Sequence, residues 1–126
     1  MKYICLAYED EGALNAMSGS AWDALRSETL SYLEELQGRG HIISAESLQS
    51  VRTSTTVRVR NGRISVTDGP FAETREQLGG FFLIQAKDLN QAIQLASGWP
   101  SARMGSIEVR PVEEGLRSGD RHQTYR

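Results

Sequence analysis

The feature that most constrains this chain is a β-hairpin signal at residues 56–67. Two runs of alternating polar and apolar residues flank the pair Asn61-Gly62. Asn-Gly in this setting predicts a two-residue type I′ turn, because both central positions of that turn need positive φ. The turn also fixes the register. One face of the hairpin then holds the pairs Val59–Ile64 and Val57–Val66, and the other face holds Arg58–Ser65 and Arg60–Arg63.

Four more segments have the pattern of β-strands, namely residues 3–8, 41–48, 81–84 and 105–110. The first and third are apolar on both faces, as in central strands that are covered on both sides. In the last segment Ile107 and Val109 alternate with polar residues, so we expect both to point inward.

Two segments show the apolar spacing of helices. We expect Ser20 to begin the first helix, with Asp23 at the capping-box position, and Gly38 and Gly40 to end it. Its predicted buried stripe is Trp22, Leu25, Thr29, Leu33 and Leu36.

The second predicted helix is capped by Asp88, with Gln91 at the capping-box position, and is stopped by Gly98 and Pro100. Its predicted buried stripe is Leu89, Ala92, Ile93 and Ala96. We expect loops in the segments that remain, which are residues 9–19, 49–55 and 68–78.

The resulting order is strand, helix, strand, hairpin, strand, helix, strand. This order predicts an α+β domain with the ferredoxin-like βαβ…βαβ plan and an inserted β-hairpin. We expect one domain over residues 1–112 and a polar C-terminal tail over residues 113–126. Such a sheet carries helices on one face only, so its second apolar face predicts a homodimer in which another copy covers it.

Composition excludes several classes of protein. The chain has 126 residues and a single cysteine, Cys5, so it can bury a core but cannot form an internal disulfide. Its apolar runs are too short for a signal peptide or a membrane helix, which predicts a cytoplasmic protein. The net charge of −2 comes from mixed acids and bases, a pattern that argues against nucleic-acid binding. His41 and His122 are far apart and Gly79-Gly80 is not a phosphate loop, so we expect no metal and no cofactor.

A longer motif follows the hairpin. Residues 68–81 read Asp-Gly-Pro-Phe-Ala-Glu-Thr-Arg-Glu-Gln-Leu-Gly-Gly-Phe. This segment resembles the signature of the DGPF-type branch of the YCII-related proteins, and the hairpin and residues 106–111 also resemble that family. The similarity covers residues 1–112. It implies a dimeric α/β barrel, in which two ferredoxin-like sheets pack together and each protomer holds a pocket.

The resemblance also implies possible functions. Family members are mostly small bacterial proteins of unassigned activity. Some relatives carry a His–Asp pair proposed as catalytic, one relative type is a dehalogenating enzyme that acts on a substituted hydroquinone, and DGPF-type members are often associated with alternative sigma factors. In the enzymatic branch the histidine lies on the first helix, where this sequence aligns Thr29 and has no histidine. A His–Asp mechanism therefore does not carry over, although the acid can still be present as Asp68.

Asp68 is the candidate catalytic residue. It follows a predicted strand and precedes Gly69-Pro70, so its side chain can simply stabilise the turn. It can also be a carboxylate held over a pocket, where burial would raise its pKa and make it a general base. The two roles can coexist.

Six other residues are candidate ligand contacts, each with a structural alternative: Tyr8, Thr29, Arg58, Phe71, Arg75 and Arg110. Arg58 and Arg110 either neutralise an anionic ligand inside a barrel or face water, and Arg75 either holds an anion or pairs with nearby acids. Phe71 plugs the core or stacks on a ligand, and Tyr8 lies at a pocket mouth or an interface. Thr29 bonds the carbonyl one turn back or offers a pocket hydroxyl.

Three functions therefore remain open from the sequence. The first is a homodimeric binding module for a small anionic or aromatic metabolite in a pocket near residues 68–71. The second is a cofactor-free enzyme, of the lyase, dehydrohalogenase-like or proton-abstracting kind, that uses Asp68 with an arginine as its electrophilic partner. The third is a protein-interaction or regulatory partner, for example of an alternative sigma factor. Fold alone does not choose among them.

Overall fold

The structure is a computed structural model that describes residues 1–115. Its elements along the chain are β1 (Lys2–Glu9), α1 (Glu11–Asn15), α2 (Gly19–Gly38), β2 (Ile42–Ser47), the 3₁₀ turn η1 (Val51–Thr53), β3 (Thr55–Arg60), β4 (Arg63–Asp68), β5 (Gln77–Gln85), α3 (Leu89–Ser97), the 3₁₀ turn η2 (Pro100–Arg103) and β6 (Ser106–Pro111).

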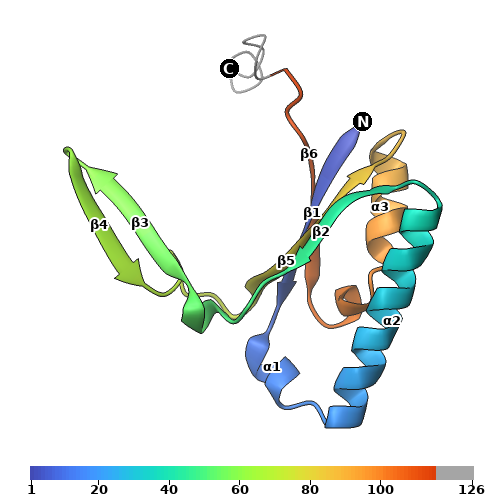
Figure 1. The fold of residues 1–126 in the computed structure, drawn as a ribbon, viewed down its shortest axis with the longest axis horizontal. Helices are drawn as coiled ribbons and strands as arrows, with labels where there is room; N and C mark the ends of the chain where they lie inside the picture. Colours follow the sequence, from blue (N-terminus) through green and yellow to red (C-terminus); the bar gives the residue numbers. More distant parts are fainter. Residues whose placement is uncertain (116–126) are drawn as a thin grey trace.

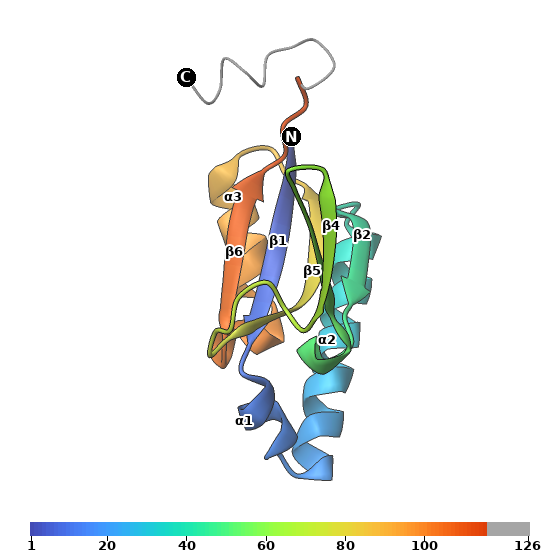
Figure 2. The same ribbon diagram turned by 90° about the vertical axis from the view of Figure 1, so that its left-hand side faces the viewer.

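Four strands form an antiparallel sheet in the order β2-β5-β1-β6, and β3 and β4 form a separate two-stranded sheet. Helices α2 and α3 both cover one face of the larger sheet, as Figure 1 shows. Figure 2 shows the β3–β4 hairpin in front of the opposite face. The predicted α+β ferredoxin-like plan with an inserted hairpin is thereby confirmed.

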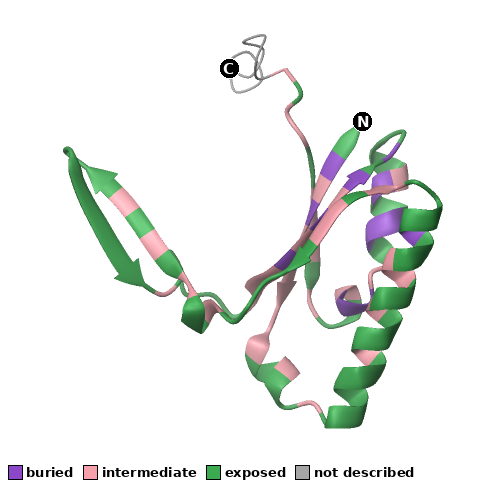
Figure 3. Ribbon diagram, viewed as in Figure 1, coloured by how far each residue is buried: buried purple, intermediate pink, exposed green. Residues whose placement is uncertain are grey.

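The hydrophobic core lies between the sheet and the two helices (Figure 3). Its buried members are Tyr3, Cys5, Leu36, Phe82, Ile84, Ala86, Ala92, Leu95 and Ala96. Trp99 stacks on Phe82 with ring centroids 4.0 Å apart, and the hydroxyl of Tyr32 on α2 donates to the Leu95 carbonyl on α3 at 2.6 Å. These contacts fix both helices and η2 against one side of the sheet.

We call the opposite side of the four-stranded sheet the outer face. Register pairs Ile4 with Leu83 and Leu6 with Phe81 on this side, and all four residues are half-buried. No helix covers the outer face in the described residues (Figure 2). The structure therefore has apolar residues on both faces of β1 and β5, as predicted.

The hairpin has the predicted register. Val57 pairs with Val66, Val59 with Ile64, Arg58 with Ser65 and Arg60 with Arg63. Asn61 and Gly62 have φ values of 52° and 75°, as a type I′ turn requires. Local turn chemistry was sufficient to specify this element.

The first helical region differs from the prediction. Residues 9–19 were expected to be a loop, but they contain α1, whose N-cap Asp10 accepts a hydrogen bond from the Ala13 amide at 3.2 Å. The N-cap of α2 is Ser18 rather than Ser20, because extended Ser18 accepts from the Ala21 amide at 3.1 Å. Two competing serines lay within one turn, and the first one caps the helix.

The second helix begins at the predicted cap, since the Asp88 carboxylate accepts from the Gln91 amide at 2.8 Å. Its predicted stripe is partly wrong. Leu89 and Ile93 are exposed, while Leu95 is buried beside Ala92 and Ala96. The side of α3 that faces the sheet is therefore the one that carries Ala92, Leu95 and Ala96, because these three residues pack in the core.

The remaining boundaries shift modestly. Strand β5 begins at Gln77, so the end of the predicted loop at residues 68–78 is strand. Ile107 and Val109 pack against the core, as expected. Most of the predicted tail, including His122, lies outside the described residues. Within residues 1–115 no helix is long and apolar enough to cross a membrane.

Candidate functional site

A cavity of about 640 Å³ lies between α2 and the helix-facing side of the sheet. Its size falls in the range of roughly 300–1,000 Å³ that is usual for small-molecule sites. The lining residues come from β1, α1, α2, β2, β5 and η2, together with Leu48 after β2 and Trp99 before η2. We call this cavity the helix–sheet pocket.

The walls of the pocket are mostly apolar and aromatic. Trp22, Leu25, Leu30 and Leu33 contribute from α2 because they follow helical spacing along one side of it. Phe82 and Trp99 contribute a stacked aromatic pair from the sheet side. Such walls suit a flat, apolar ring more than a flexible polar chain.

One end of the pocket is polar. Glu9 is the last residue of β1, and Ser101 lies in η2. Ser101 is only 6% exposed, and its hydroxyl oxygen has no hydrogen-bond partner among the described residues. Because an unpaired buried hydroxyl is costly, this oxygen is a natural contact for a bound polar group.

The pKa of the Glu9 carboxyl is shifted at this polar end of the pocket. Burial raises its pKa above the usual range of glutamate, and the nearby Glu11 carboxylate adds a smaller upward effect. Ser101 acts in the opposite direction, since its hydroxyl is close enough to favour the charged carboxylate, although not in the geometry of a formed hydrogen bond. The carboxyl therefore keeps its proton to higher pH than a solvated glutamate does.

Glycine in β5 gives the Glu9 side chain its room. A β-carbon at Gly79 would lie 2.5 Å from Glu9 Oε2, so any larger residue would displace the carboxyl. At Gly80 a β-carbon would lie 2.8 Å from the backbone oxygen of Glu46 on the neighbouring strand. Gly79 therefore leaves space for the Glu9 side chain in the pocket, and Gly80 allows β2 and β5 to approach each other closely.

A positive charge lies on the α2 wall. Arg26 lines the pocket and makes no ion pair within residues 1–115. Two residues further along the same helix, Glu28 pairs with Arg103 of η2 through contacts of 2.9 and 2.7 Å. This bidentate pair joins α2 to the turn that carries Ser101.

Thr29 is the one predicted contact residue that lines the helix–sheet pocket. Its hydroxyl donates to the Leu25 carbonyl at 2.8 Å, one turn back in the helix. A threonine hydroxyl that donates in this way can still accept a hydrogen bond. A ligand role for Thr29 stays a prediction.

The predicted acid, Asp68, ends β4 and is exposed. It lies outside the pocket lining, next to Gly69, whose φ is 101° and whose amide donates to the Ser54 carbonyl at 2.8 Å. The turn that was predicted after Asp68 is therefore present in the structure. A catalytic role for Asp68 stays a prediction that the pocket geometry does not support.

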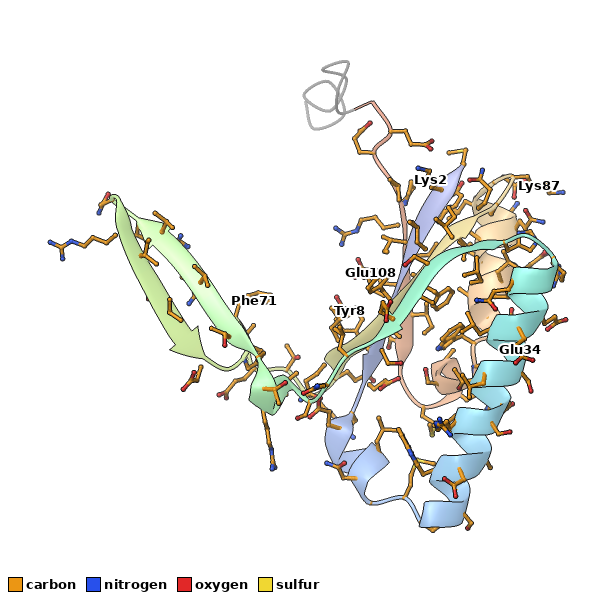
Figure 4. All side chains as sticks on the ribbon, in the orientation of Figure 1. Lys2, Tyr8, Glu34, Phe71, Lys87 and Glu108 are labelled. Atoms are coloured by element: carbon orange, nitrogen blue, oxygen red, sulfur yellow. The ribbon has the colours of Figure 1, made fainter. Side chains whose placement is uncertain are left out.

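The other predicted contacts lie outside the pocket lining as well. Phe71 is 81% exposed, so it does not plug the core, and its carbonyl accepts from Arg58 at 3.4 Å. Arg75 approaches Asp10 at 3.5 Å, and Arg110 pairs with Glu108 on β6. Figure 4 shows Tyr8 and Glu108 on the side of the sheet that faces the hairpin. The sheet therefore lies between Thr29 on α2 and Tyr8.

Sequence reasoning missed Glu9 and Ser101. A carboxylate directly after an apolar strand was a weak available signal for Glu9. Nothing in the sequence marked Ser101, because its position in the pocket depends on how η2 packs against α2 and β1. Within residues 1–115 no group of three or more His, Cys, Asp or Glu side chains is placed to hold a metal ion.

Comparison with known proteins places the chain in a family. The YCII-related domain matches residues 1–115. The chain belongs to the YCII-related family. An uncharacterized protein of Rhizobium meliloti (strain 1021) is 33% identical over 114 residues, which cover 89% of this chain and 92% of the relative. The assignment to the DGPF-type branch stays a prediction.

One similar solved structure is 5-chloro-2-hydroxyhydroquinone dehydrochlorinase (TftG) from Burkholderia phenoliruptrix AC1100, in complex with 2,5-dihydroxybenzoquinone. The TM-score is 0.57 with 13% identity, over 93% of this chain and 98% of the dehydrochlorinase. At this identity the likeness shows a shared fold. It leaves the activity of this YCII-related protein open.

Proposed function

We propose that this YCII-related protein binds a small aromatic molecule that carries hydroxyl or carboxylate groups, in the helix–sheet pocket. The observation that carries the proposal is the unpaired, buried Ser101 hydroxyl beside the protonatable Glu9 carboxyl at the end of an aromatic-walled cavity. A ring hydroxyl placed at this end would give the Ser101 oxygen the partner it lacks.

The charge of the pocket narrows the ligand further. When it holds a proton, the Glu9 carboxyl offers one O–H donor, and Arg26, which makes no ion pair among residues 1–115, offers a guanidinium from α2. A phenol or hydroquinone suits the Glu9–Ser101 end, and an added carboxylate suits Arg26. The dehydrochlorinase in complex with 2,5-dihydroxybenzoquinone supports oxygen-substituted rings as the first compounds to test.

A second candidate function is proton transfer within the same pocket. A general acid or base works best when its pKa lies near the operating pH, and burial moves the Glu9 pKa upward in that direction. Glu9, rather than Asp68, is therefore our first choice for an acid–base residue of a cofactor-free enzyme. Turnover that is lost in Glu9→Gln while binding persists would support this function.

The homodimer is also proposed rather than demonstrated. The half-buried apolar residues of the outer face support it, because a second copy could cover them. Association with an alternative sigma factor rests on the DGPF-type resemblance alone. It would gain support only if the small-molecule tests failed on well-folded protein.

The test is a thermal-shift screen of phenols, hydroquinones and aromatic acids against wild type, Ser101→Ala and Ser65→Ala. Ligand at ten times its dissociation constant stabilises by about 1.4 kcal/mol, or roughly 5 °C in Tm for a domain of this size. Losing one hydrogen bond in Ser101→Ala should weaken binding by about tenfold. Ser65→Ala is the matched control, since Ser65 lies on the hairpin, away from the pocket lining.

Ser101→Ala should also change the stability of the ligand-free protein little, because the hydroxyl that it removes makes no formed hydrogen bond within residues 1–115. An unchanged Tm with lost ligand shift identifies a binding residue. Equal ligand shifts in all three proteins would contradict the proposed site.

A further inference from the structure

Three consecutive acids, Glu9, Asp10 and Glu11, lie between the helix–sheet pocket and the base of the hairpin. Glu9 supplies the carboxyl at the polar end of the pocket. Asp10 caps α1 and lies 3.5 Å from Arg75, which precedes β5. The Glu11 carboxylate contacts η1, which precedes β3. The segment that follows β1 therefore contacts both of the connections that join the hairpin to the rest of the chain.

Glu11 makes two hydrogen bonds to the start of η1. Its Oε1 accepts from the Val51 amide at 2.9 Å, and its Oε2 accepts from the Ser50 hydroxyl at 2.9 Å. Val51 is the first residue of η1, so its amide has no carbonyl partner inside that short turn. Hydrogen bonds to an ionised carboxylate are roughly twice as strong as neutral ones. We call this pair of hydrogen bonds the α1–η1 contact.

Helix α1 depends on this contact because little else holds it. The helix is five residues long, and none of its residues is buried. It makes no extensive contact with any other described helix or strand. The Glu11 amide adds a long hydrogen bond of 3.3 Å to the side-chain oxygen of Gln77 on β5. Glu11 therefore fixes α1 through both its side chain and its backbone.

The position of α1 matters to the helix–sheet pocket. Leu14, which is on α1 with Glu11, lines the pocket. Figure 1 shows α1 between the base of the hairpin and the start of α2, which carries another wall of the pocket. The Glu11 carboxylate is also close enough to Glu9 to raise the pKa of that carboxyl. A displaced α1 would therefore move one wall of the pocket and alter the surroundings of its polar end.

We propose that Glu11 is a positioning residue, whose α1–η1 contact holds the Leu14 wall and the polar end of the helix–sheet pocket in the arrangement that binds a ligand. The proposal rests on the proposed function, because it concerns the same pocket. It adds a connection between that pocket and the base of the hairpin through one side chain. Such coupling is reciprocal, so a ligand that prefers the pocket with the contact formed also stabilises the contact.

The first test needs no ligand. Hydrogen exchange followed by mass spectrometry compares wild type, Glu11→Ala, Glu11→Gln and Glu34→Gln in peptides that cover residues 9–17 and 49–54. Losing both hydrogen bonds in Glu11→Ala should speed exchange in the two peptides by roughly tenfold. Glu11→Gln keeps one acceptor oxygen, so its effect should be smaller. Glu34→Gln is the matched control, because Glu34 is on α2 and lies outside the pocket lining. Unchanged exchange in Glu11→Ala would overturn the positioning role.

The second test adds 4-hydroxybenzoate and hydroquinone as probes and measures their dissociation constants by isothermal titration calorimetry. Glu11→Ala should raise the constant of the tighter probe by about fivefold or more, and Glu11→Gln by less. In wild type, that probe at saturation should also slow exchange over residues 49–54, although none of these residues lines the pocket. The added protection should be absent in Glu11→Ala.

The outcomes separate the positioning role from the proposed function. Circular dichroism confirms that each variant is folded. Equal dissociation constants in wild type and Glu11→Ala, or the same ligand-dependent protection of residues 49–54 in both, would overturn the positioning role and leave the pocket as the ligand site. A wild type that binds neither probe would overturn the proposed function and the positioning role together, even if the first test shows the α1–η1 contact.

Discussion

The four-stranded sheet and the β3–β4 hairpin both carry apolar faces, but in the described residues only the sheet has such a face covered by helices. In the sheet, β1 and β5 bury one apolar face beneath α2 and α3, and aromatic contacts such as Phe82–Trp99 fill the space. In the hairpin, the equivalent face of β3 and β4 stays exposed. Alternation therefore specifies a strand and its register, whereas the surface that covers the strand is specified elsewhere in the chain or in another copy.

The contrast also separates two kinds of site. The helix–sheet pocket is built inside one chain, where burial perturbs Glu9 and isolates the Ser101 hydroxyl. The hairpin offers apolar area and positive charge, and none of its residues lines the helix–sheet pocket. The first arrangement suits a small ligand, and the second suits a protein surface.

The sharpest way to test this contrast uses thiol chemistry. Burial raises the pKa of the Cys5 thiol in β1 to about 12, so almost no reactive thiolate exists at pH 8. Compared with an ordinary cysteine of pKa near 8.5, alkylation of Cys5 should be slower by roughly a thousandfold or more. A cysteine introduced in the hairpin as Ser65→Cys should react at the ordinary rate. Mass spectrometry of protein that is alkylated in native buffer measures both rates. Equal rates for the two thiols would show that Cys5 is not protected by burial in the core.

Deleting an aromatic ring from each region gives the next largest contrast. Phe82 is fully buried, so Phe82→Ala should lower the free energy of unfolding by about 3–5 kcal/mol. Phe71 is 81% exposed, so Phe71→Ala should change it by less than about 0.5 kcal/mol. Urea denaturation followed by circular dichroism measures both. A comparable loss in Phe71→Ala would place that ring in a packed environment.

The smallest expected effect is a pH dependence. The pKa of Glu9 is higher in the folded protein than in the unfolded chain, so the folded state binds this proton more tightly. The stabilisation is complete below the unfolded pKa and is lost as the pH rises through the folded one. Above the usual glutamate range, wild type should therefore lose some stability that Glu9→Gln retains. Glu34→Gln, an exposed substitution on α2, is the control and should follow wild type across the same pH series of melting curves.

Local chemistry explains which parts of the fold were predictable. The Asn61-Gly62 turn and the Asp88 cap act through neighbouring atoms, so the sequence specifies both. Ser18 and Ser20 are equally suitable N-cap residues by type. They are distinguished only by where the backbone changes from extended to helical, which happens directly after Ser18. The short helix α1 was missed because its acidic and small residues lack an apolar stripe.

The site was harder to predict because it depends on tertiary contacts. Asp68 and the candidate arginines stand out in the sequence, yet none of them lines the helix–sheet pocket. Glu9 and Ser101 come from opposite ends of the chain and meet only when β1 and η2 pack together. No local pattern records that meeting. The predictions for Thr29, Asp68 and the other candidate contacts still await their own tests.

The central claim is that the helix–sheet pocket, and not the Asp68 turn, is the ligand site. Both tryptophans of the chain, Trp22 and Trp99, line that pocket, so intrinsic fluorescence reports on it directly. We would titrate a phenol or hydroquinone from the thermal-shift screen into wild type, Ser101→Ala and Asp68→Asn. Saturable quenching that weakens about tenfold in Ser101→Ala and is unchanged in Asp68→Asn is the predicted result. Quenching that is lost in Asp68→Asn and kept in Ser101→Ala would contradict the account.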